Sequence, residues 1–359
     1  MRSLIGRFYS SKLVASYVSQ GQKWTGDELS VLEKIRVVPL AAESLGVRSM
    51  CTFVETPHVR VLLDAGISLC PYRFNLSPHP IEFQTIDKLR KIIAVKAQDA
   101  QVVTISHYHF DHHTPSFEDW FVNWTQRTVT ARQIYEGKRV LVKNPRENIN
   151  PSQRHRAWLF QKTGGKFASS IESADGKSFV FGEDTVLRFS EAVSHGPEDA
   201  SLGWVVILTV EYKGEERFVF APDVQGPMAE KTVELISQNK PQMVMLGGPP
   251  FYLEGFKVDS AQVQRGLRNL EKIVRAVPLT LIEHHSLRDE MWHQKMQQVF
   301  DSARSEGHEV TTAAGLLDQP ETILESKRKQ LYLEDPPSRE FEKWIKQGLD
   351  SKKAAKPPI

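Results

Sequence analysis

The sequence predicts an α/β fold in which several strands end in side chains able to bind metal. Two observations predict this class. Short runs of β-branched and apolar residues alternate along the chain with longer segments of helical periodicity. Histidine and aspartate follow directly after several of these runs, most densely in residues 104–113, TISHYHFDHH. The predicted strands therefore lead into a candidate metal site.

Composition sets limits on the class of protein. The chain has 359 residues, of which 40% are hydrophobic and 25% charged, typical of one large globular domain with additions, or at most two domains. The net charge is only +2, so binding of anions needs local clusters of basic residues. Two cysteines, Cys51 and Cys70, are too few for a disulfide framework and indicate a reducing, cytoplasmic compartment. The sequence has no apolar run of the ~20 residues that a transmembrane helix needs, which argues against a membrane protein.

The N-terminus allows two interpretations. Residues 1–26 contain four basic residues and several serines, and the first acid is Asp27. This composition is typical of an organellar transit peptide, and it also fits a short amphipathic extension or a start codon placed too early. We expect residues 1–34 to be an extension, flexible or targeting, outside the main domain at 35–318.

The first half of the main domain is predicted to alternate strands with helices. Apolar, β-branched composition predicts the strands Ile35–Leu40, Met50–Glu55, Val59–Asp64, Gln101–Ser106 and Arg139–Val142. Helical spacing of apolar residues, or a proline suited to a first helical turn, predicts helices at His79–Gln98, Phe117–Trp124 and from Pro151 onward.

The densest cluster of candidate ligands consists of four residues in the loop that follows the strand Gln101–Ser106. Alternation along an extended backbone places His107 and His109 on the same side, and Asp111 and His112 follow as the chain turns. Three imidazoles and a carboxylate within six residues are costly to bury unless they bind a divalent metal, since neutral imidazole and carboxylate are ligands of zinc and similar ions. A solvated histidine-rich turn is the alternative interpretation.

The segment 138–166 is strongly basic. It contains Glu147 as its only acid and eight basic residues: Lys138, Arg139, Lys143, Arg146, Arg154, Arg156, Lys162 and Lys166. The predicted helix from Pro151 adds aromatic residues to Arg154 and Arg156, a combination that suits an anionic substrate such as a phosphodiester or nucleic acid. A solvated basic face is the competing interpretation.

The second half repeats the same alternation. Its predicted strands are Lys177–Phe181, Thr185–Val193, Leu202–Glu211, Arg217–Ala221, Gln242–Leu246, Leu279–Glu283 and Glu309–Ala313. Its predicted helices are Pro227–Gln238, Ser260–Ala276 and Arg288–Ser305. Residues 319–359 form a charged, helical tail, whose end at Ser351–Ile359 is predicted to be disordered.

Further candidate ligands stand at the ends of predicted strands. They are Asp64, His195, Asp223 and the pair His284 and His285. Asp64 is better suited to orienting the histidine loop than to binding metal itself.

The order of these residues resembles the metallo-β-lactamase superfamily, whose signature is the His-x-His-x-Asp-His of residues 107–112. More closely, the segments PLAAESLGVRSM, SHYHFDHHTPSF, KNPRENIN, PDVQGP, GGPP and EHHSLRD resemble an archaeal group of uncharacterised metallo-hydrolases. The resemblance implies a four-layer αββα sandwich of two mixed sheets flanked by helices.

The resemblance also implies a role for each candidate ligand. His107, His109 and His195 would hold one divalent ion. Asp111, His112 and one histidine of the 284/285 pair would hold a second, with Asp223 between the two ions. His284 is preferred because HHSLR can be laid over the strand-end pattern of tRNA 3′-processing nucleases, and His285 is the alternative. Zinc is the expected metal, and manganese or iron would also suit these ligands.

The implied function is hydrolysis by a hydroxide held between two metal ions, with Asp111 and Asp64 assisting as catalytic residues. The basic segment favours an anionic substrate, either a small molecule or a nucleic acid. A lactone or thioester hydrolase is the alternative, although His113–Thr114–Pro115 replaces the glycines of thioester-hydrolysing relatives. A di-iron oxidoreductase is disfavoured by His109, because such relatives usually have glutamate at this position. A non-catalytic metal protein is disfavoured by the seven ligands, because structural zinc sites normally have four. The sequence leaves a homo-oligomer open.

Overall fold

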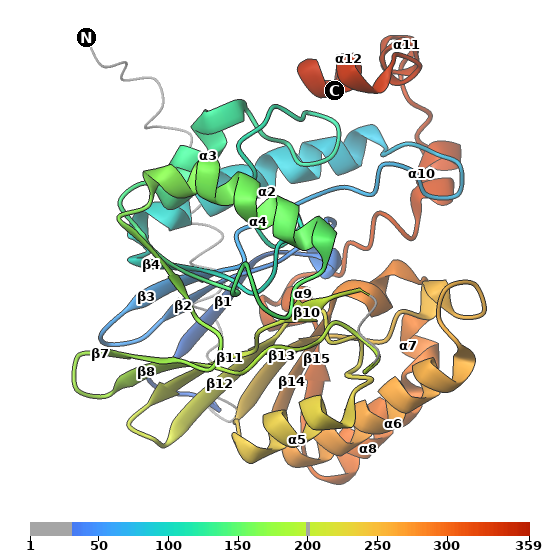
Figure 1. Ribbon diagram of the computed structural model, residues 1–359. Helices are drawn as coiled ribbons and strands as arrows, with labels where there is room; N and C mark the ends of the chain where they lie inside the picture. The colour runs from blue at the N-terminus through green and yellow to red at the C-terminus, as the bar shows by residue number, and fades with distance from the viewer. Residues whose placement is uncertain (1–30, 199–201) are drawn as a thin grey trace.

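The computed structural model describes residues 31–198 and 202–359, and in them two large sheets face each other with helices on both outer faces (Figure 1). The expectation for residues 1–34 therefore lies almost wholly outside the described residues. Within the described part, no helix combines the length and apolarity needed to cross a membrane.

The first sheet has six strands, which are adjacent in sequence order. They are β1 (Arg36–Ala42), β2 (Met50–Glu55), β3 (Arg60–Leu63), β4 (Val102–Ile105), β5 (Arg139–Val142) and β6 (Ser170–Ser173). The first three pair antiparallel across short connections, whereas β3 to β6 pair in parallel. Parallel pairing needs long crossovers, which helices provide between these strands.

The second sheet has seven strands in the order β15-β14-β13-β12-β11-β8-β7. They are β7 (Ser178–Phe181), β8 (Thr185–Phe189), β11 (Leu208–Tyr212), β12 (Glu216–Ala221), β13 (Met243–Gly247), β14 (Leu279–Glu283) and β15 (Glu309–Thr311). The strands from β12 to β15 pair in parallel, and the others pair antiparallel. A separate ribbon joins β9 (Val193–Ser194) to β10 (Trp204–Val205).

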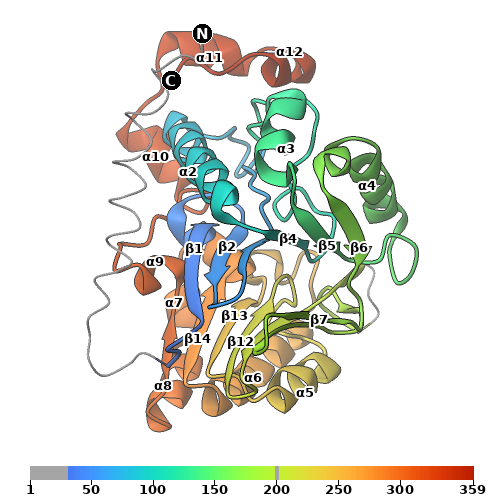
Figure 2. The same cartoon turned by 90° about the vertical axis from the view of Figure 1, so that its left-hand side faces the viewer.

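Three buried apolar clusters hold the layers together. One fills the space between the sheets, with Leu63 of β3 and Phe220 of β12 among its members. The first sheet is covered by α2 (Pro80–Asp99), α3 (Arg127–Tyr135) and α4 (Pro151–Lys162), and the second by α5 (Glu230–Gln238), α6 (Ser260–Ala276) and α8 (Gln297–Ser305) (Figure 2). The predicted αββα sandwich of two mixed sheets is confirmed.

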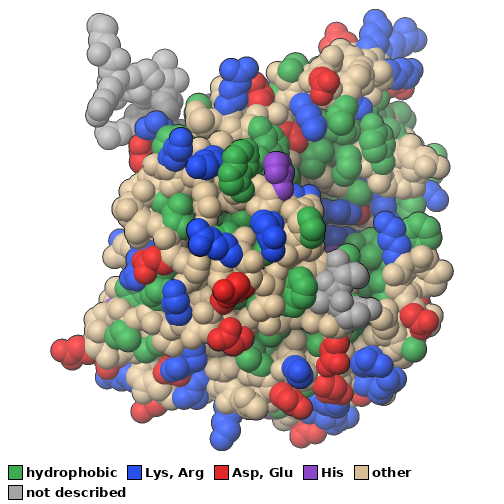
Figure 3. Space-filling view, in the orientation of Figure 1, with side chains coloured by type: hydrophobic (Ala, Val, Ile, Leu, Met, Phe, Trp, Pro, Cys, Tyr) green, Lys and Arg blue, Asp and Glu red, His purple; other side chains and the backbone are tan. Residues whose placement is uncertain are grey.

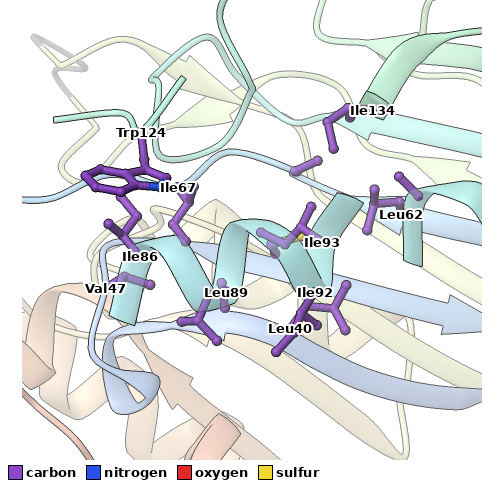
Figure 4. Packing of buried hydrophobic residues seen from close by; sticks show 14 of the residues in the cluster. Leu40, Val47, Leu62, Ile67, Ile86, Leu89, Ile92, Ile93, Trp124 and Ile134 are labelled. Atoms are coloured by element: carbon purple, nitrogen blue, oxygen red, sulfur yellow. The ribbon is translucent and has the colours of Figure 1, made fainter. Parts of the chain in front are cut away.

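Helix α2 shows how the outer layers are formed. Pro80 occupies its first turn, and the His79 ring and the Glu82 side chain cap its N-terminus reciprocally. Its apolar face, which includes Ile86, Leu89 and Ile93, packs on Leu40 and Leu62 of the first sheet (Figure 4). The predicted helix His79–Gln98 is thus observed almost to the residue.

The C-terminal helices also belong to this layer. They are α10 (Arg328–Glu334), α11 (Arg339–Ile345) and α12 (Leu349–Ala354). Phe341 and Trp344 place their rings 5.9 and 5.6 Å from the ring of Phe83 in α2. The predicted disorder of Ser351–Ile359 is wrong where α12 runs through it, because the Lys352 ammonium is buried and donates to the hydroxyl of Tyr72 at 3.1 Å.

Several predicted elements differ in detail from the structure. Phe117–Trp124 is a series of turns, because the Asp119 carboxylate accepts hydrogen bonds from the backbone of Phe121 and Val122 and so competes with a helix. Thr185–Val193 is broken after β8, where Ser190 hydrogen-bonds to Ile207 through both backbone and hydroxyl.

The same contact interrupts the predicted strand Leu202–Glu211, which divides into β10 and β11. The predicted helix Arg288–Ser305 divides into α7 (Trp292–Lys295) and α8, and the last strand ends at Thr311 rather than Ala313. Helix α3 and strand β6 were not predicted.

Candidate metal centre

The candidate ligands gather where strands of both sheets end. Asp64 follows β3, residues 106–113 follow β4, and His195 follows β9. Asp223 and His284 come after β12 and β14 of the second sheet. The carboxyl ends of parallel strands lie at one edge of a sheet, so residues distant in sequence meet there.

The backbone at this edge adopts unusual conformations. Asp64, Asp223 and His284 have φ angles of 44°, 53° and 66°, in the left-handed region that costs free energy for residues other than glycine. Gly66 lies directly against the signature loop, since a Cβ placed there would lie 2.3 Å from the backbone nitrogens of His112 and His113. Close packing therefore fixes how the loop presents its side chains.

The first set of ligands comprises His107, His109, His195 and Asp223, whose ligand atoms all lie within 4.8 Å of one another. His107 Nε2 lies 3.0 Å from His109 Nδ1 and 3.0 Å from Asp223 Oδ2. His195 Nε2 lies 2.9 Å from the same carboxylate oxygen. These four atoms converge on a single point, as the ligands of one metal ion do.

The second set comprises Asp111, His112 and His284, which also lie within 4.8 Å of one another. His284 Nε2 is 3.4 Å from His112 Nε2 and 3.5 Å from Asp111 Oδ2. It is also 2.9 Å from Asp223 Oδ1. Asp223 thus contacts both sets, with Oδ1 beside His284 and Oδ2 beside the first set and 3.3 Å from His112 Nε2.

The outer ring nitrogens of three histidines meet oxygen atoms. His107 Nδ1 lies 3.0 Å from Ser106 Oγ, a hydroxyl that itself donates to Asp64. His112 Nδ1 lies 2.8 Å from Asp64 Oδ2, and His284 Nδ1 lies 2.9 Å from Glu43 Oε2. A ring that donates from Nδ1 keeps a lone pair on Nε2, so all three rings direct a metal-binding nitrogen inward.

Two functional candidates, Glu43 and Arg288, were missed from the sequence. Glu43 lies in the short 3₁₀ helix η2 (Glu43–Leu45), is buried, and accepts from Arg288 Nη2 at 2.6 Å as well as from His284. Glu43 and His284 are 241 residues apart, so only the fold shows their pairing. The available signal was Glu43 within AAESLG, one of the segments that carried the resemblance.

The 284/285 pair is divided by its surroundings. Both Nε2 atoms approach Asp223 Oδ1, at 2.9 Å for His284 and 3.2 Å for His285. Only His284 also lies in the group with Asp111 and His112. His113, by contrast, is directed away from the centre and bonds the backbone oxygen of His109 at 2.9 Å.

Electrostatic coupling in this cluster is strong. Burial alone would raise the pKa of Asp223, but His284, His112 and His195 hold it well below its usual range. Burial would lower the pKa of His284, yet the Asp223 and Glu43 carboxylates raise it to about 9. Burial, together with His112 and His109, holds the pKa of His107 well below its usual range.

The centre opens to solvent on one side. The His109 side chain is 29% exposed and that of Asp111 is 17% exposed, whereas the other ligands are buried. The face drawn in Figure 3 is hollowed at one place, and Lys and Arg side chains lie near this hollow.

The two arginines predicted as substrate contacts occupy different places on α4. Arg156 is half-buried, stacks over the Phe110 ring of the signature loop at 4.6 Å, and interacts electrostatically with Asp111. Arg154 is exposed and donates to the backbone oxygen of Arg146. Only Arg156 is in contact with the signature loop.

The residues present suit divalent metal ions. Five imidazoles and two carboxylates are the donor set that zinc, manganese and iron accept. Asp223 Oδ1 and His285 Nε2 are buried, yet neither forms a hydrogen bond of good geometry within the described residues. Buried polar atoms without such partners indicate that a further group completes the site.

Archaeal relatives cover most of the chain. A UPF0282 protein of Korarchaeum cryptofilum is 40% identical over 298 residues, which are 83% of this chain and 94% of the relative. One of Methanopyrus kandleri is 40% identical over 84% of this chain and 100% of the relative. One of Thermococcus gammatolerans is 43% identical over 83% of this chain and 95% of the relative. The predicted likeness to an archaeal group is confirmed. No protein-family profile matches the chain.

Solved structures give weaker similarities. A metallo-β-lactamase from Cronobacter sakazakii matches with a TM-score of 0.34 and 15% identity, covering 85% of this chain and 100% of that one. A long-form RNase Z from yeast matches with a TM-score of 0.39 and 14% identity, covering 70% and 37%. Both TM-scores are below 0.5, so the function proposed below rests on the residues of the site.

Proposed function

This chain belongs to the UPF0282 family, and we propose that it is a metal-dependent hydrolase with a centre for two divalent ions. The observation that carries the proposal is the position of Asp223. Its Oδ2 lies beside His107 and His195 of the first set and also 3.3 Å from His112 of the second, while its Oδ1 lies beside His284 of the second. A carboxylate shared between two ligand sets is suited to bridging two ions.

The three histidines of the first set would hold one ion, and Asp111, His112 and His284 of the second set would hold the other. When bound, such a pair of ions makes a water molecule acidic enough to act as a nucleophile near neutral pH. Zinc is the proposed metal because the site offers histidine and carboxylate side chains, which are common zinc ligands.

Two carboxylates of the chain would assist in different ways. Asp111 Oδ2 lies at the open side of the centre and can accept the proton of the attacking water, then transfer it to the leaving group. Asp64 is buried and holds the His112 ring and the Ser106 backbone, so it would preserve the geometry of the loop.

The proposed substrate is anionic, with a phosphodiester as the leading class. Arg156 supports this, because its guanidinium lies beside the signature loop and is half-exposed. Asn150, which caps the N-terminus of α4, and Gln153 of α4 both donate to the backbone oxygen of Leu202, which keeps this basic helix beside the His195 segment. A guanidinium can pair with two phosphate oxygens at once.

Metal analysis combined with a hydrolysis panel tests the proposal. Protein purified and loaded with zinc, manganese or iron would be assayed against bis(4-nitrophenyl) phosphate, a short RNA, a lactone and a thioester. We expect about two ions per chain and the fastest turnover on a phosphodiester. Turnover of only the lactone or thioester would support the proposal of a hydrolase and reject the proposal of an anionic substrate. Failure to bind any of the metals would reject the function.

A further inference from the structure

His285 differs from three of the other inward-facing histidines in what faces its outer nitrogen. The outer nitrogens of His107, His112 and His284 meet oxygen acceptors, as described above. Donors also approach two metal-ligand candidates, because Arg288 Nη2 lies 3.3 Å from His284 Nδ1 and the Gln225 amide nitrogen lies 3.5 Å from His195 Nδ1. The outer nitrogen of His285 meets two groups that donate: the Tyr252 hydroxyl at 3.3 Å and Arg288 Nη1 at 3.3 Å. This difference determines which ring nitrogen carries the proton.

Arginine settles the direction of these hydrogen bonds. A guanidinium has five N–H donors and no acceptor, so His285 Nδ1 can bond Arg288 only through a lone pair. Arg288 Nη1 also donates to the Tyr252 oxygen at 3.1 Å, which leaves the hydroxyl proton of Tyr252 free to point toward His285. The Arg288 contact therefore requires an acceptor at Nδ1, and the Tyr252 hydroxyl can donate to the same lone pair.

The donors are held firmly in place. Arg288 is 3% exposed and pairs with Glu43, and its backbone oxygen accepts from Arg73 Nη2 at 3.1 Å. The Tyr252 ring lies parallel to that of His285, with 9° between the planes, and the Arg73 guanidinium is 5.0 Å from the Tyr252 ring centre. The proton position on His285 is thus fixed by rigid neighbours.

We propose that His285 is not a metal ligand but a catalytic residue that donates a hydrogen bond from Nε2–H to the substrate oxygen that gains charge. A neutral ring with a lone pair at Nδ1 carries its proton at Nε2. That atom is buried at the centre, 3.2 Å from Asp223 Oδ1, and has no hydrogen bond of good geometry within the described residues. Tyr252 and Arg288 are positioning residues.

This role deepens the proposed function and rests on it. Hydrolysis of a phosphodiester, or of an ester or thioester, moves negative charge onto an oxygen of the substrate before the leaving group departs. A donor already aimed at that position stabilises the transition state more than the ground state. The proposal also explains why two adjacent histidines converge on one carboxylate oxygen: one binds metal and the other binds substrate.

Zinc analysis of matched variants separates the two histidines. We expect His284→Ala to lose about one zinc ion per chain and His285→Ala to keep the wild-type content. On bis(4-nitrophenyl) phosphate, His285→Ala should lower kcat by about 10²–10³-fold. His285→Gln, whose amide can still donate, should recover part of that loss. A His285→Ala protein that loses zinc while His284→Ala retains it would overturn the assignment.

Nuclear magnetic resonance of ¹⁵N-histidine-labelled protein reads the tautomer directly and needs no substrate. We expect the His285 signals to report a proton at Nε2, and in the zinc-loaded protein we expect His284 to carry its proton at Nδ1. Tyr252→Phe should weaken this preference and reduce kcat more than it changes the Michaelis constant. A proton at Nδ1 of His285 would reject the proposal. If the wild-type protein bound no zinc, the proposed function would fail, whereas the tautomer of the zinc-free protein would still test His285.

Discussion

At the scale of single residues, the candidate centre depends on histidines whose two nitrogens have different tasks. His107 Nε2 approaches His109 and Asp223, while its Nδ1 contacts Ser106. Because this ring belongs to the first set, we expect His107→Ala to lower the zinc content from about two ions per chain to one or fewer and to abolish hydrolysis. Metal analysis and the phosphodiester assay measure both effects.

The matched control is His293→Ala. His293 is also a histidine, but its side chain is 61% exposed and pairs with Glu321 away from the centre. This variant should keep wild-type zinc and activity. Full zinc occupancy in His107→Ala would contradict the assignment of the first set.

The second set of ligands depends on the hydrogen bond between Glu43 and His284. Glu43 accepts from His284 Nδ1 and from Arg288, so replacing it with a neutral amide weakens the hold on the His284 ring. We expect Glu43→Gln to lower the affinity for the second zinc ion by about 10–100-fold. Titration against a chelator measures this affinity. Glu230→Gln, which changes an exposed carboxylate paired with Lys272, is the control and should leave the affinity unchanged. Equal affinities in the two variants would remove Glu43 from the site.

Residue-level prediction worked where ligands were adjacent in sequence and failed where partners were distant. The signature at 107–112 could be recognised because its spacing alone brings four candidate ligands into one loop. Glu43 and Tyr252 carry no such pattern, since each becomes significant only through contact with residues of the 284–288 segment. The structure supplied these contacts through packing of the two sheets.

At the scale of elements, apolar strands were predictable and polar segments were not. β4, β5 and β14 are buried on both faces, and such strands appear as continuous apolar runs. Helix α3, with the sequence RTVTARQIY, has a weak apolar pattern and was missed. The turns at Phe117–Trp124 were mistaken for a helix because aromatic residues there pack without helical geometry.

Helix α4 carries a prediction of its own, because its two arginines are placed differently. Arg156 stacks on Phe110 beside the centre, whereas Arg154 is exposed and turned toward Arg146. We expect Arg156→Ala to raise the Michaelis constant for anionic substrates about tenfold, as the loss of one hydrogen bond to a charged group would. Arg154→Ala is the matched control and should change the Michaelis constant little. Steady-state kinetics on a phosphodiester distinguish the two variants, and equal Michaelis constants would favour the solvated-face interpretation.

At the scale of the whole molecule, one fully buried and one partly buried ion pair join the C-terminal segment to the first layer. Arg328 is fully buried and pairs with Glu82 of α2 at 2.7 Å. Arg48 bonds Glu325 through Nε and Nη2, each at 2.6 Å. These partners are 246 and 277 residues apart, so their pairing could not be predicted from local sequence patterns. Charged residues of the C-terminal segment thus provide contacts that attach it to the first layer.

The Arg48–Glu325 pair predicts how stability depends on pH. Burial would raise the pKa of Glu325, but Arg48 outweighs it and holds the pKa well below its usual range. A carboxyl group with a lowered folded-state pKa contributes stability above its unfolded-state pKa of about 4.3, and that contribution is lost as the pH falls further. We expect Glu325→Gln to lower the free energy of unfolding at pH 7 by about 3 kcal/mol.

The difference between the wild-type protein and this variant should shrink steadily as the pH falls below about 4.3, because protonation then removes the wild-type advantage. Denaturant unfolding at several pH values measures it. Glu334→Gln, which alters an exposed glutamate of α10, is the control and should show no such convergence. A stability gap that stayed constant down to acidic pH would mean that Glu325 acts through packing rather than through its charge.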